Sequence, residues 1–384
     1  MKLQNPETVK KQFGIYLHIP FCKQACHYCN YHFSTKLKRK GELVDAICKE
    51  LLLRKNELTG IVETIYFGGG TPSLLTSEEL KQIFETIFSN YNISENPEIT
   101  LEANPDDLTP TRINELAESP INRLSIGVQS FFEEDLKLMN RAHNSTEALE
   151  SIKEAKKHFE NISIDLIYGV PGMSEARWME NLNIALGLNV PHISCYALTV
   201  EPKTALETFI EKGVVAPIDE DAAEKHYETL LKVTEQSGYE NYEFSNFGKP
   251  GFRSRNNTAY WEEIPFIGIG PGAHSYDGGG RSWNVENNIK YIKGIQQGEL
   301  PSDGEVLTTR DKYNEYVMTG LRTSKGVSLK KIEQEYGEEF LNYLMDQARI
   351  HLKEGFLLIE DNTLKVTPKS RFIRDGIASE LFWV

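Results

Sequence analysis

Apolar runs of strand length alternate with stretches of helical periodicity along most of the chain. Apolar residues recur at three- and four-residue spacing after the runs, as in Leu80, Ile83 and Ile87, and this spacing predicts amphipathic helices. Turn residues bound the runs, which favours short, buried strands. We expect six strands of this type, at 13–19, 62–67, 98–103, 123–128, 162–169 and 192–199.

Six strand–helix units joined by short turns imply a parallel sheet with helices outside, because parallel strands need a crossover connection. The turn after the first strand lacks the glycine fingerprint of dinucleotide-binding folds. The sequence therefore predicts an α/β fold, a partial (β/α)6 barrel of the TIM type, rather than a doubly wound sheet. In such barrels functional residues gather at the carboxyl ends of the strands.

The pattern loosens from about residue 203, where aromatic residues mix with Asn and Gly. We expect loop extensions here that close over a cofactor or a flat aromatic ligand. A packed, irregular edge of the barrel is the alternative interpretation.

A second pattern begins after residue 300. Helical periodicity starts at Thr309 and Ser328 and near Glu339, and Asp361-Asn362 stands between two strand-like runs as a hairpin signal. The sequence thus predicts two domains. Residues 1–300 form the barrel with loop extensions over its mouth, and residues 301–384 form a small helical, winged-helix-like domain.

Charge and apolar content limit the range of partners. The 42 basic and 56 acidic side chains give a net charge of −14, which argues against nucleic acid as a ligand and limits membrane contact to a peripheral one. No apolar run approaches the roughly 18 residues of a membrane span, and the polar start lacks the apolar core of a signal peptide. Five cysteines without a secretory segment predict a reducing cytoplasm.

The strongest chemical signal lies directly after the first strand. Cys22, Cys26 and Cys29 follow Pro20 with C-x3-C-x2-C spacing. Three converging thiolates suit a metal centre, and thiolate is the usual ligand of iron–sulfur clusters. A cubic cluster normally takes four, so a cluster held by three would keep one iron open for a substrate or cofactor.

Two alternatives compete for this cysteine loop. A disulfide framework fits poorly, because five cysteines are few for a chain of 384 residues. A structural zinc site is the stronger rival, since His27 or His32 could complete a Cys3His set. Structural zinc sites usually join two separated ligand pairs, however, and no second pair exists in the sequence.

Polar residues stand at the ends of several predicted strands. Glycines 68–70 follow the second strand and either approach a ligand closely or form an ordinary tight turn. Glu102 ends the third strand and Gln129 follows the fourth. Asp165 lies within an apolar strand, where a carboxylate needs a partner or a ligand, and Arg141 could pair with a carboxylate in bidentate fashion. Singly, each fits a salt bridge, but as a set they indicate a site.

A series of motifs in fixed order resembles one known family over nearly the whole chain. The series includes the thiol triplet and reads YLHIPFC, YFGGGTPS, LEANP, RLSIGVQSF, NRAH, DLIYGVPG and YALTVEPKT. With the C-terminal unit, it is similar to the coproporphyrinogen-oxidase-like family of radical S-adenosylmethionine (SAM) proteins.

This resemblance implies cofactors and their residues. Cys22, Cys26 and Cys29 would hold a [4Fe-4S] cluster whose open iron chelates SAM, and an electron from the cluster would release a 5′-deoxyadenosyl radical. The SAM region would be lined by Tyr16, Tyr28, Gly69, Gly70, Thr71, Glu102, Gln129, Arg141, Asp165 and Ala197.

The family contains two functions, and the sequence favours one of them. Oxygen-independent coproporphyrinogen III oxidases carry a fourth cysteine, C-x3-C-x2-C-x-C, and a longer segment before the first strand. This chain has Tyr31 at the fourth position and only 21 residues before Cys22. Those departures resemble the haem chaperones, which bind haem and pass it to acceptor proteins.

One departure concerns haem itself. The chaperones typically show an H-N-x-x-Y-W motif, whereas this chain has Asn256 where His is expected, followed by Asn257, Tyr260 and Trp261 in register. Asparagine is a poor ligand for haem iron. Tyr260 or another residue would have to replace the histidine.

The primary hypothesis is therefore a haem chaperone that uses the cluster and SAM as structural or regulatory partners. The alternative is an oxidase of the coproporphyrinogen dehydrogenase type that decarboxylates propionate side chains of porphyrinogen. RNA modification is a third hypothesis, which the net charge opposes. The sequence identifies neither the electron donor nor the haem acceptor.

Overall fold

The computed structural model describes residues 11–384, so the polar start of the chain lies outside the described residues. Within-chain contacts group these residues into two compact units. The first unit comprises residues 11–25, 31–125 and 255–305, and the second comprises residues 26–30, 126–254 and 306–384. Each unit is described by itself.

The first unit is built on a mostly parallel sheet with the strand order β12-β11-β10-β9-β1-β2-β3. β1 is parallel to both β2 and β9, and β2 is parallel to β3, whereas β10 runs antiparallel to β9 and β11. The strands are β1 (Gln12–Ile19), β2 (Ile61–Gly69), β3 (Ile93–Ala103), β9 (Phe266–Ile269), β10 (His274–Tyr276), β11 (Gly280–Asn284) and β12 (Ser302–Val306). The first three were predicted. β9 to β11 fall where loop extensions were expected, and β12 lies at the start of the segment that was assigned to the C-terminal domain.

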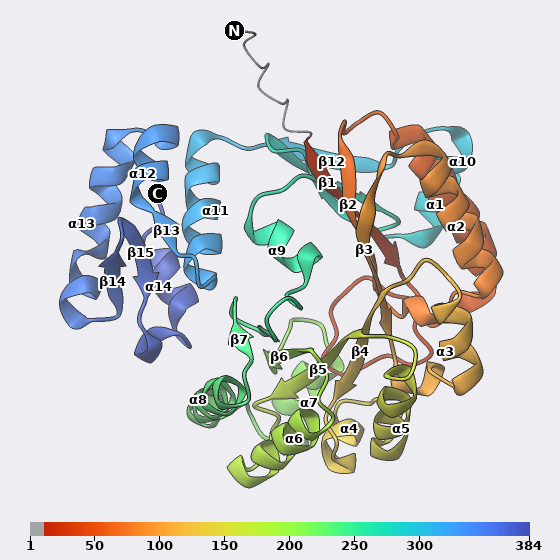
Figure 1. Ribbon diagram of the computed structural model, residues 1–384, viewed down its shortest axis with the longest axis horizontal. Coiled ribbons are helices and arrows are strands. Elements are labelled where there is room, and N and C mark those ends of the chain that lie inside the picture. The colour runs from red at the N-terminus through yellow and green to blue at the C-terminus, as the bar shows by residue number, and fades with distance from the viewer. Residues whose placement is uncertain (1–10) are drawn as a thin grey trace, which may run out of the picture. The chain divides into compact units, whose positions relative to one another are not determined.

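The two faces of this sheet differ in chemistry. Ile15, Leu17 and Ile19 are at most 1% exposed on one face, and Tyr16 and His18 project from the other because side chains alternate along a strand. Helices cover the apolar face, as Figure 1 shows for α1 and α2. The helices of this unit are α1 (Lys40–Arg54), α2 (Ser77–Asn90), α3 (Pro110–Ala117), α9 (Arg255–Trp261) and α10 (Asn288–Gln297). Thr76 and Glu79 form a capping box at the start of α2.

The short helix α9 lies on the other face of the sheet (Figure 1). Glu98 on β3 accepts the backbone N–H groups of Arg255, at 3.0 Å, and Asn256, at 2.9 Å. The carboxylate thus satisfies donors that have no partner within the first turn of a helix. Expecting a loop at this stretch was wrong, because the residue that holds the helix is more than 150 positions away in sequence.

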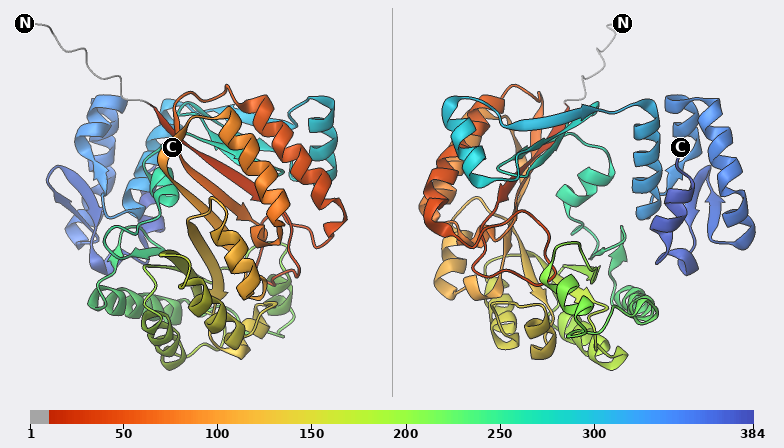
Figure 2. Two further views of the ribbon diagram at one scale, coloured as in Figure 1. Left: turned by 45° about the vertical axis from the view of Figure 1, so that its right-hand side comes forward. Right: turned by 180° about the vertical axis from the view of Figure 1, so that it is seen from behind.

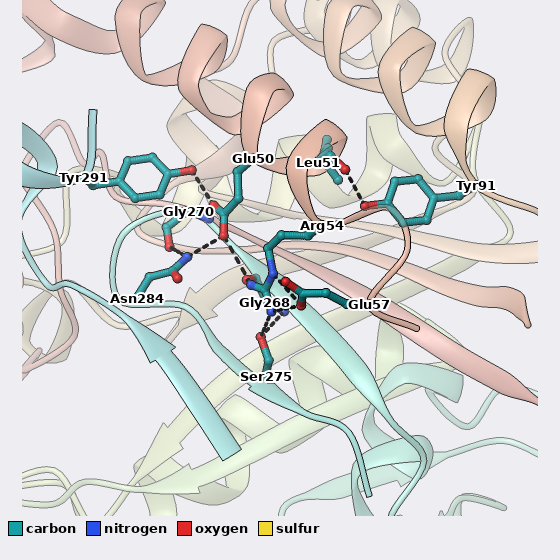
Figure 3. A network of polar contacts seen from close by, with 10 residues as sticks. All are labelled: Glu50, Leu51, Arg54, Glu57, Tyr91, Gly268, Gly270, Ser275, Asn284 and Tyr291. Carbon is teal, nitrogen blue, oxygen red and sulfur yellow. Dashed lines mark hydrogen bonds and ion pairs between the residues drawn. The ribbon is translucent and has the colours of Figure 1, made fainter. Parts of the chain in front are cut away.

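A buried ion pair joins α1 to the strands that the sequence did not predict. Glu50 is fully buried and accepts hydrogen bonds from Gly270 N (2.9 Å), Asn284 Nδ2 (2.8 Å) and Tyr291 OH (2.5 Å). Arg54 lies 3.2 Å from Glu50, and Figure 3 shows these groups converging beneath α1. Burial raises the pKa of Glu50, and Arg54 and the hydrogen-bond donors oppose that shift.

The guanidinium of Arg54 also makes hydrogen bonds beyond the ion pair. It donates to the carbonyl oxygen of Gly268 at 2.7 Å and to Ser275 Oγ at 3.1 Å (Figure 3). A buried charge of this kind is stable only while its partners remain in place.

The second unit contains the remaining predicted strands. Its sheet order is β4-β5-β6-β8-β7, where β4 is divided between the units, β5 and β6 are parallel, and β8 is antiparallel to its neighbours. The strands are β4 (Arg123–Gln129), β5 (Asn161–Tyr168), β6 (His192–Ala197), β7 (Glu240–Asn241) and β8 (Asn246–Gly248). The helices between and after them are α4 (Glu133–Leu138), α5 (Ser145–Ala155), α6 (Glu175–Gly187), α7 (Ala205–Glu211) and α8 (Glu220–Gln236).

The C-terminal segment belongs to the second unit and has its own small sheet, of order β13-β15-β14, beside helices (Figure 2). Asp361 and Asn362 both have positive φ at the predicted hairpin. The elements are α11 (Thr309–Arg322), β13 (Val327–Ser328), α12 (Leu329–Lys331), α13 (Glu338–Glu354), β14 (Leu357–Glu360), β15 (Thr363–Val366) and α14 (Arg374–Glu380). Arg374 Nη2 donates to Tyr227 OH on α8 at 2.7 Å.

The α/β fold predicted from the sequence, with mostly parallel strands, helices between them and a C-terminal addition, is confirmed. The domain boundary near residue 300 stays a prediction. Among residues 11–384, no helix is both long enough and apolar enough to cross a membrane.

Replacing Glu50 with Ala should destabilise the protein, because it leaves the Arg54 charge buried without its carboxylate. We expect the free energy of unfolding to fall by about 3–5 kcal/mol, measured by urea denaturation. The matched control is Glu85→Ala, which breaks the exposed Lys81–Glu85 pair on α2 and should cost less than about 1 kcal/mol. Equal losses for the two variants would contradict this assignment.

Candidate functional site

In the first unit the cysteine loop is closed at its base. Cys22 N donates to the carbonyl oxygen of Ser34 at 3.1 Å, and Ser34 N donates to that of Pro20 at 2.8 Å. The backbone therefore leaves β1 and returns beside it within fifteen residues. Gly70 N also donates to the Ile19 carbonyl oxygen at 2.9 Å, which ties the end of β2 to the start of the loop.

The middle of the loop belongs to the second unit, where His27 anchors it. The backbone N–H of His27 donates to the Met139 carbonyl oxygen at 3.1 Å, and its own carbonyl oxygen accepts from Leu206 N at 2.8 Å. The imidazole Nδ1 donates to the Leu138 carbonyl oxygen at 2.8 Å, and the ring meets Phe209 edge to face. His27 thus holds the loop in place.

His32, the other histidine considered for a zinc site, also makes a hydrogen bond within the protein. His32 Nε2 lies 2.7 Å from Asn288 Oδ1 in the first unit. Among the described residues, no three His, Cys, Asp or Glu side chains form a group that could hold a single metal ion.

Cys26 lies among hydrogen-bond donors in the second unit. Arg141 Nη1 donates to Cys26 Sγ at 3.2 Å, and Arg141 Nη2 donates to the Gly127 carbonyl oxygen at 2.8 Å. Tyr28 also hydrogen-bonds to Cys26, and burial raises the pKa of Tyr28 while Arg141 opposes the shift. The sequence suggested a carboxylate as the partner of Arg141, whereas these bonds of the guanidinium reach a sulfur and a carbonyl.

The donor set fits an iron–sulfur cluster. Cys22, Cys26 and Cys29 are half-buried thiols outside any disulfide, whereas Cys48 and Cys195 are buried. A cluster needs ligands that are accessible yet shielded, and hydrogen bonds to a ligand sulfur tune the cluster. Arg141 and Tyr28 supply such bonds to Cys26.

In the first unit, Glu102 is oriented at the end of β3. Tyr66 OH donates to Glu102 Oε1 at 2.8 Å, and Gly69 N donates to Glu102 Oε2 at 3.2 Å. The Tyr16 ring stacks on Tyr66 with 6.1 Å between centroids, and burial followed by the charge of Glu102 raises the pKa of Tyr16. The sequence reading missed Tyr66, although strand alternation places it on the same face as Tyr16.

The glycine run has a structural cause that the sequence did not reveal. Gly69 lies within β2 at φ +104°, and a Cβ there would lie 2.5 Å from His18 Nδ1. A Cβ on Gly70 would lie 2.7 Å from the Ile19 carbonyl oxygen. Close approach of β1 thus requires both glycines. Thr71 follows as a buried residue 3.4 Å from Asn104 Nδ2.

The remaining predicted residues lie in the second unit. Gln129 ends β4 with φ 66° and is 9% exposed, a left-handed conformation that costs energy for a residue with a side chain. Asp165 on β5 is half-buried and pairs in register with Ser194, and Ala197 ends β6 opposite Tyr168. The charge of Asp165, after burial, raises the pKa of Cys195.

The predicted site residues therefore form two sets, each within its own unit. The first set lies on or directly beyond β1, β2 and β3 and consists of Tyr16, Cys22, Gly69, Gly70, Thr71 and Glu102. The second set consists of Cys26, Tyr28, Cys29, Gln129, Arg141, Asp165 and Ala197.

Comparison with known proteins decides the family. Residues 16–185 match the model of the radical SAM superfamily, and residues 307–373 match the HemN C-terminal domain. A protein of Bacillus subtilis named haem chaperone HemW is 36% identical over 88% of this chain and 93% of its own length. The chain belongs to the radical SAM family, in the HemW-containing branch of its coproporphyrinogen-oxidase-like members.

Two further relatives extend this result. The haem chaperone HemW of Lactococcus lactis is 35% identical over 96% of this chain and 99% of its own length. The solved structure of coproporphyrinogen III oxidase HemN from Escherichia coli has a TM-score of 0.84 at 23% identity, covering 97% of this chain and 90% of that one. The latter shows a shared fold. Membership of the radical SAM family implies a [4Fe-4S] cluster and SAM as cofactors.

The buried His18 should make stability depend on pH. His18 Nε2 donates to the His32 carbonyl oxygen at 2.9 Å, and burial lowers the pKa of His18 from 6.5 to about 4. The unfolded chain binds a proton below pH 6.5 that the folded protein resists, so stability is present above this pH and lost as the pH falls towards 4. This group should remove about 2 kcal/mol between pH 7 and pH 5.

Urea denaturation of the wild type and of His18→Gln at both pH values checks this. The variant should lose less stability on acidification than the wild type by that amount, whereas the exposed His158→Gln should behave as the wild type does. If the wild type and His18→Gln lost the same amount of stability between pH 7 and pH 5, the assignment of His18 as a neutral, buried imidazole would be wrong.

Proposed function

We propose that this protein is a haem chaperone, with a [4Fe-4S] cluster and SAM as its resident partners. The observation that carries the proposal is Tyr31, which stands where the oxidases of the family carry a fourth cysteine. A phenol side chain supplies no sulfur, so this position adds no fourth thiolate to the triplet. The high coverage of relatives named haem chaperones supports the same assignment.

We assign the cluster to Cys22, Cys26 and Cys29. The cluster supplies one-electron chemistry and an open iron for SAM. Arg141 and Tyr28 would hold the Cys26 sulfur in position and offset its negative charge through the hydrogen bonds described above. His27 would keep the loop anchored whether or not the cluster is loaded.

We assign the SAM region to the two sets of residues named above. Glu102 is suited to accept hydrogen bonds from an ammonium group, because Tyr66 and Gly69 fix its orientation and each carboxylate oxygen can accept a second bond. The strained backbone at Gln129 is consistent with a functional position.

The cargo would be haem, and its acceptor and the electron donor are proteins that the sequence does not identify. We place the protein in the cytoplasm, since thiols and a cluster of this type need a reducing compartment. The net charge of −14 disfavours nucleic acid as a partner and any membrane contact beyond a peripheral one.

The alternative is an oxygen-independent coproporphyrinogen III oxidase, which the fold shared with the Escherichia coli enzyme favours. It predicts that SAM is cleaved and that porphyrinogen loses CO2. The two functions make opposite predictions for haem and for porphyrinogen.

Serine substitutions should separate cluster ligands from other cysteines. Cys22→Ser, Cys26→Ser and Cys29→Ser should each lower the iron content after anaerobic reconstitution from about four per chain to well below that. Cys48→Ser and Cys195→Ser are the matched controls, since both cysteines are buried and stand outside the C-x3-C-x2-C triplet, and both variants should keep their iron. Iron and zinc analysis with the visible absorption spectrum gives the measurement. Loss of iron from the control variants alone would overturn the assignment.

Parallel assays of the reconstituted protein should separate chaperone from oxidase. We expect about one haem bound per chain in an anaerobic titration, and no CO2 or protoporphyrinogen from coproporphyrinogen III with SAM and reductant. Turnover of porphyrinogen without haem binding would establish the alternative. A protein that neither binds haem nor converts porphyrinogen would contradict both the chaperone and the oxidase assignment.

A further inference from the structure

Asn256, which stands at the first position of the haem-linked H-N-x-x-Y-W motif, is buried in this chain. Asn256 is 7% exposed, its Oδ1 accepts from Thr64 Oγ1 at 3.3 Å, and its backbone N–H donates to Glu98. A side chain at this position points into the sheet rather than towards a large ligand. If the protein binds haem, as proposed above, the iron ligand must come from elsewhere.

The β10–β11 hairpin of the first unit presents a face of different composition. His274 pairs across the hairpin with Trp283, and Tyr276 pairs with Arg281. Figure 3 shows that the alternate residues Ser275 and Asn284 point to the Arg54–Glu50 ion pair under α1. Because side chains alternate along strands, the four paired residues project from the opposite face.

The two cross-strand pairs follow each other on this face of the hairpin. His274 lies 6.0 Å from the Trp283 ring, and the Arg281 guanidinium lies 5.1 Å from the centre of the Tyr276 ring. Trp283 and Arg281 are half-buried and His274 is exposed. The hairpin thus offers an imidazole, a cation and aromatic rings on adjacent strands.

From Tyr276, ring contacts extend across β9 to helix α9. Phe266 lies 6.5 Å from Tyr276 and 4.5 Å from Tyr260 on α9, which it meets edge to face. Tyr260 is 38% exposed, so its ring remains accessible. An apolar, aromatic strip of this kind suits a flat ligand.

Among the histidines of the first unit's described residues, His274 has the most accessible imidazole. His18 is 4% exposed and hydrogen-bonds at both ring nitrogens, to Tyr16 OH and the His32 carbonyl oxygen. His32 bonds to Asn288. Tyr260 is a weaker candidate, because burial and the charge of Glu102 raise the pKa of its hydroxyl and disfavour the phenolate that iron would need.

We propose that His274 is the axial ligand of haem iron in this protein, with Trp283 and Tyr260 contacting the macrocycle and Arg281 pairing with a propionate. The chemistry matches haem at each point. Neutral imidazole is a common iron ligand, aromatic rings pack on a porphyrin, and guanidinium binds carboxylate in bidentate fashion. This proposal rests on the haem-chaperone function.

Titration of the full-length protein with ferric haem, followed by absorption and electron paramagnetic resonance, tests the ligand directly. His274→Ala should weaken haem binding at least about tenfold and lose the imidazole-ligated spectrum. Free imidazole added to the variant should restore that spectrum. His274→Tyr should give the spectrum of a phenolate ligand instead. Equal iron content and circular dichroism would show that these variants remain folded.

His158→Ala is the matched control, since His158 is an exposed histidine of the second unit, and it should bind haem as the wild type does. Wild-type haem spectra retained in folded His274→Ala would overturn the assignment of His274 while leaving the chaperone function in place. Failure of the wild type itself to bind haem would instead remove the proposed function.

Discussion

Strand alternation in the first unit determines where chemistry can occur. One face of its sheet consists of Ile, Leu and Val side chains that pack under helices, and the other carries Tyr16, Tyr66, Glu102 and the residues of the β10–β11 hairpin. The Glu50–Arg54 ion pair fixes the hairpin to α1 from the apolar side. A one-residue change of register would exchange the two faces, so the polar face depends on the same pairing that forms the core.

Hydrogen bonds also fix the backbone of the cysteine loop. Its base is closed by Cys22 and Ser34 in the first unit, and its middle is anchored by His27 in the second. Neither anchor uses a sulfur atom of the triplet. Arg141 and Tyr28 contribute hydrogen bonds to the sulfur of Cys26.

Much of the fold could be predicted because its signals are local. The six parallel-type strands and the Asp361-Asn362 hairpin each depend on residues that are neighbours in sequence. The thiol triplet belongs to the same class of signal. These features follow from periodicity, caps and turn residues, whatever the rest of the chain does.

Other features could not be predicted, because they depend on partners that are far away in sequence. Helix α9 is held by Glu98, the short strands β9 to β11 complete their bonding through Glu50 and Arg54, and Gly69 is required by His18. No local pattern reports such contacts. The same holds for the bond from Arg141 to Cys26, which joins residues 115 positions apart in sequence.

The central claim is that three cysteines hold a cluster with one iron open to SAM. The most direct measurement is the electron paramagnetic resonance spectrum of the reduced, reconstituted protein before and after addition of SAM. We expect the signal of a reduced [4Fe-4S] cluster and a change in its g values when SAM binds the open iron. A spectrum unaffected by SAM, or zinc in place of iron with all three thiols intact, would contradict the account.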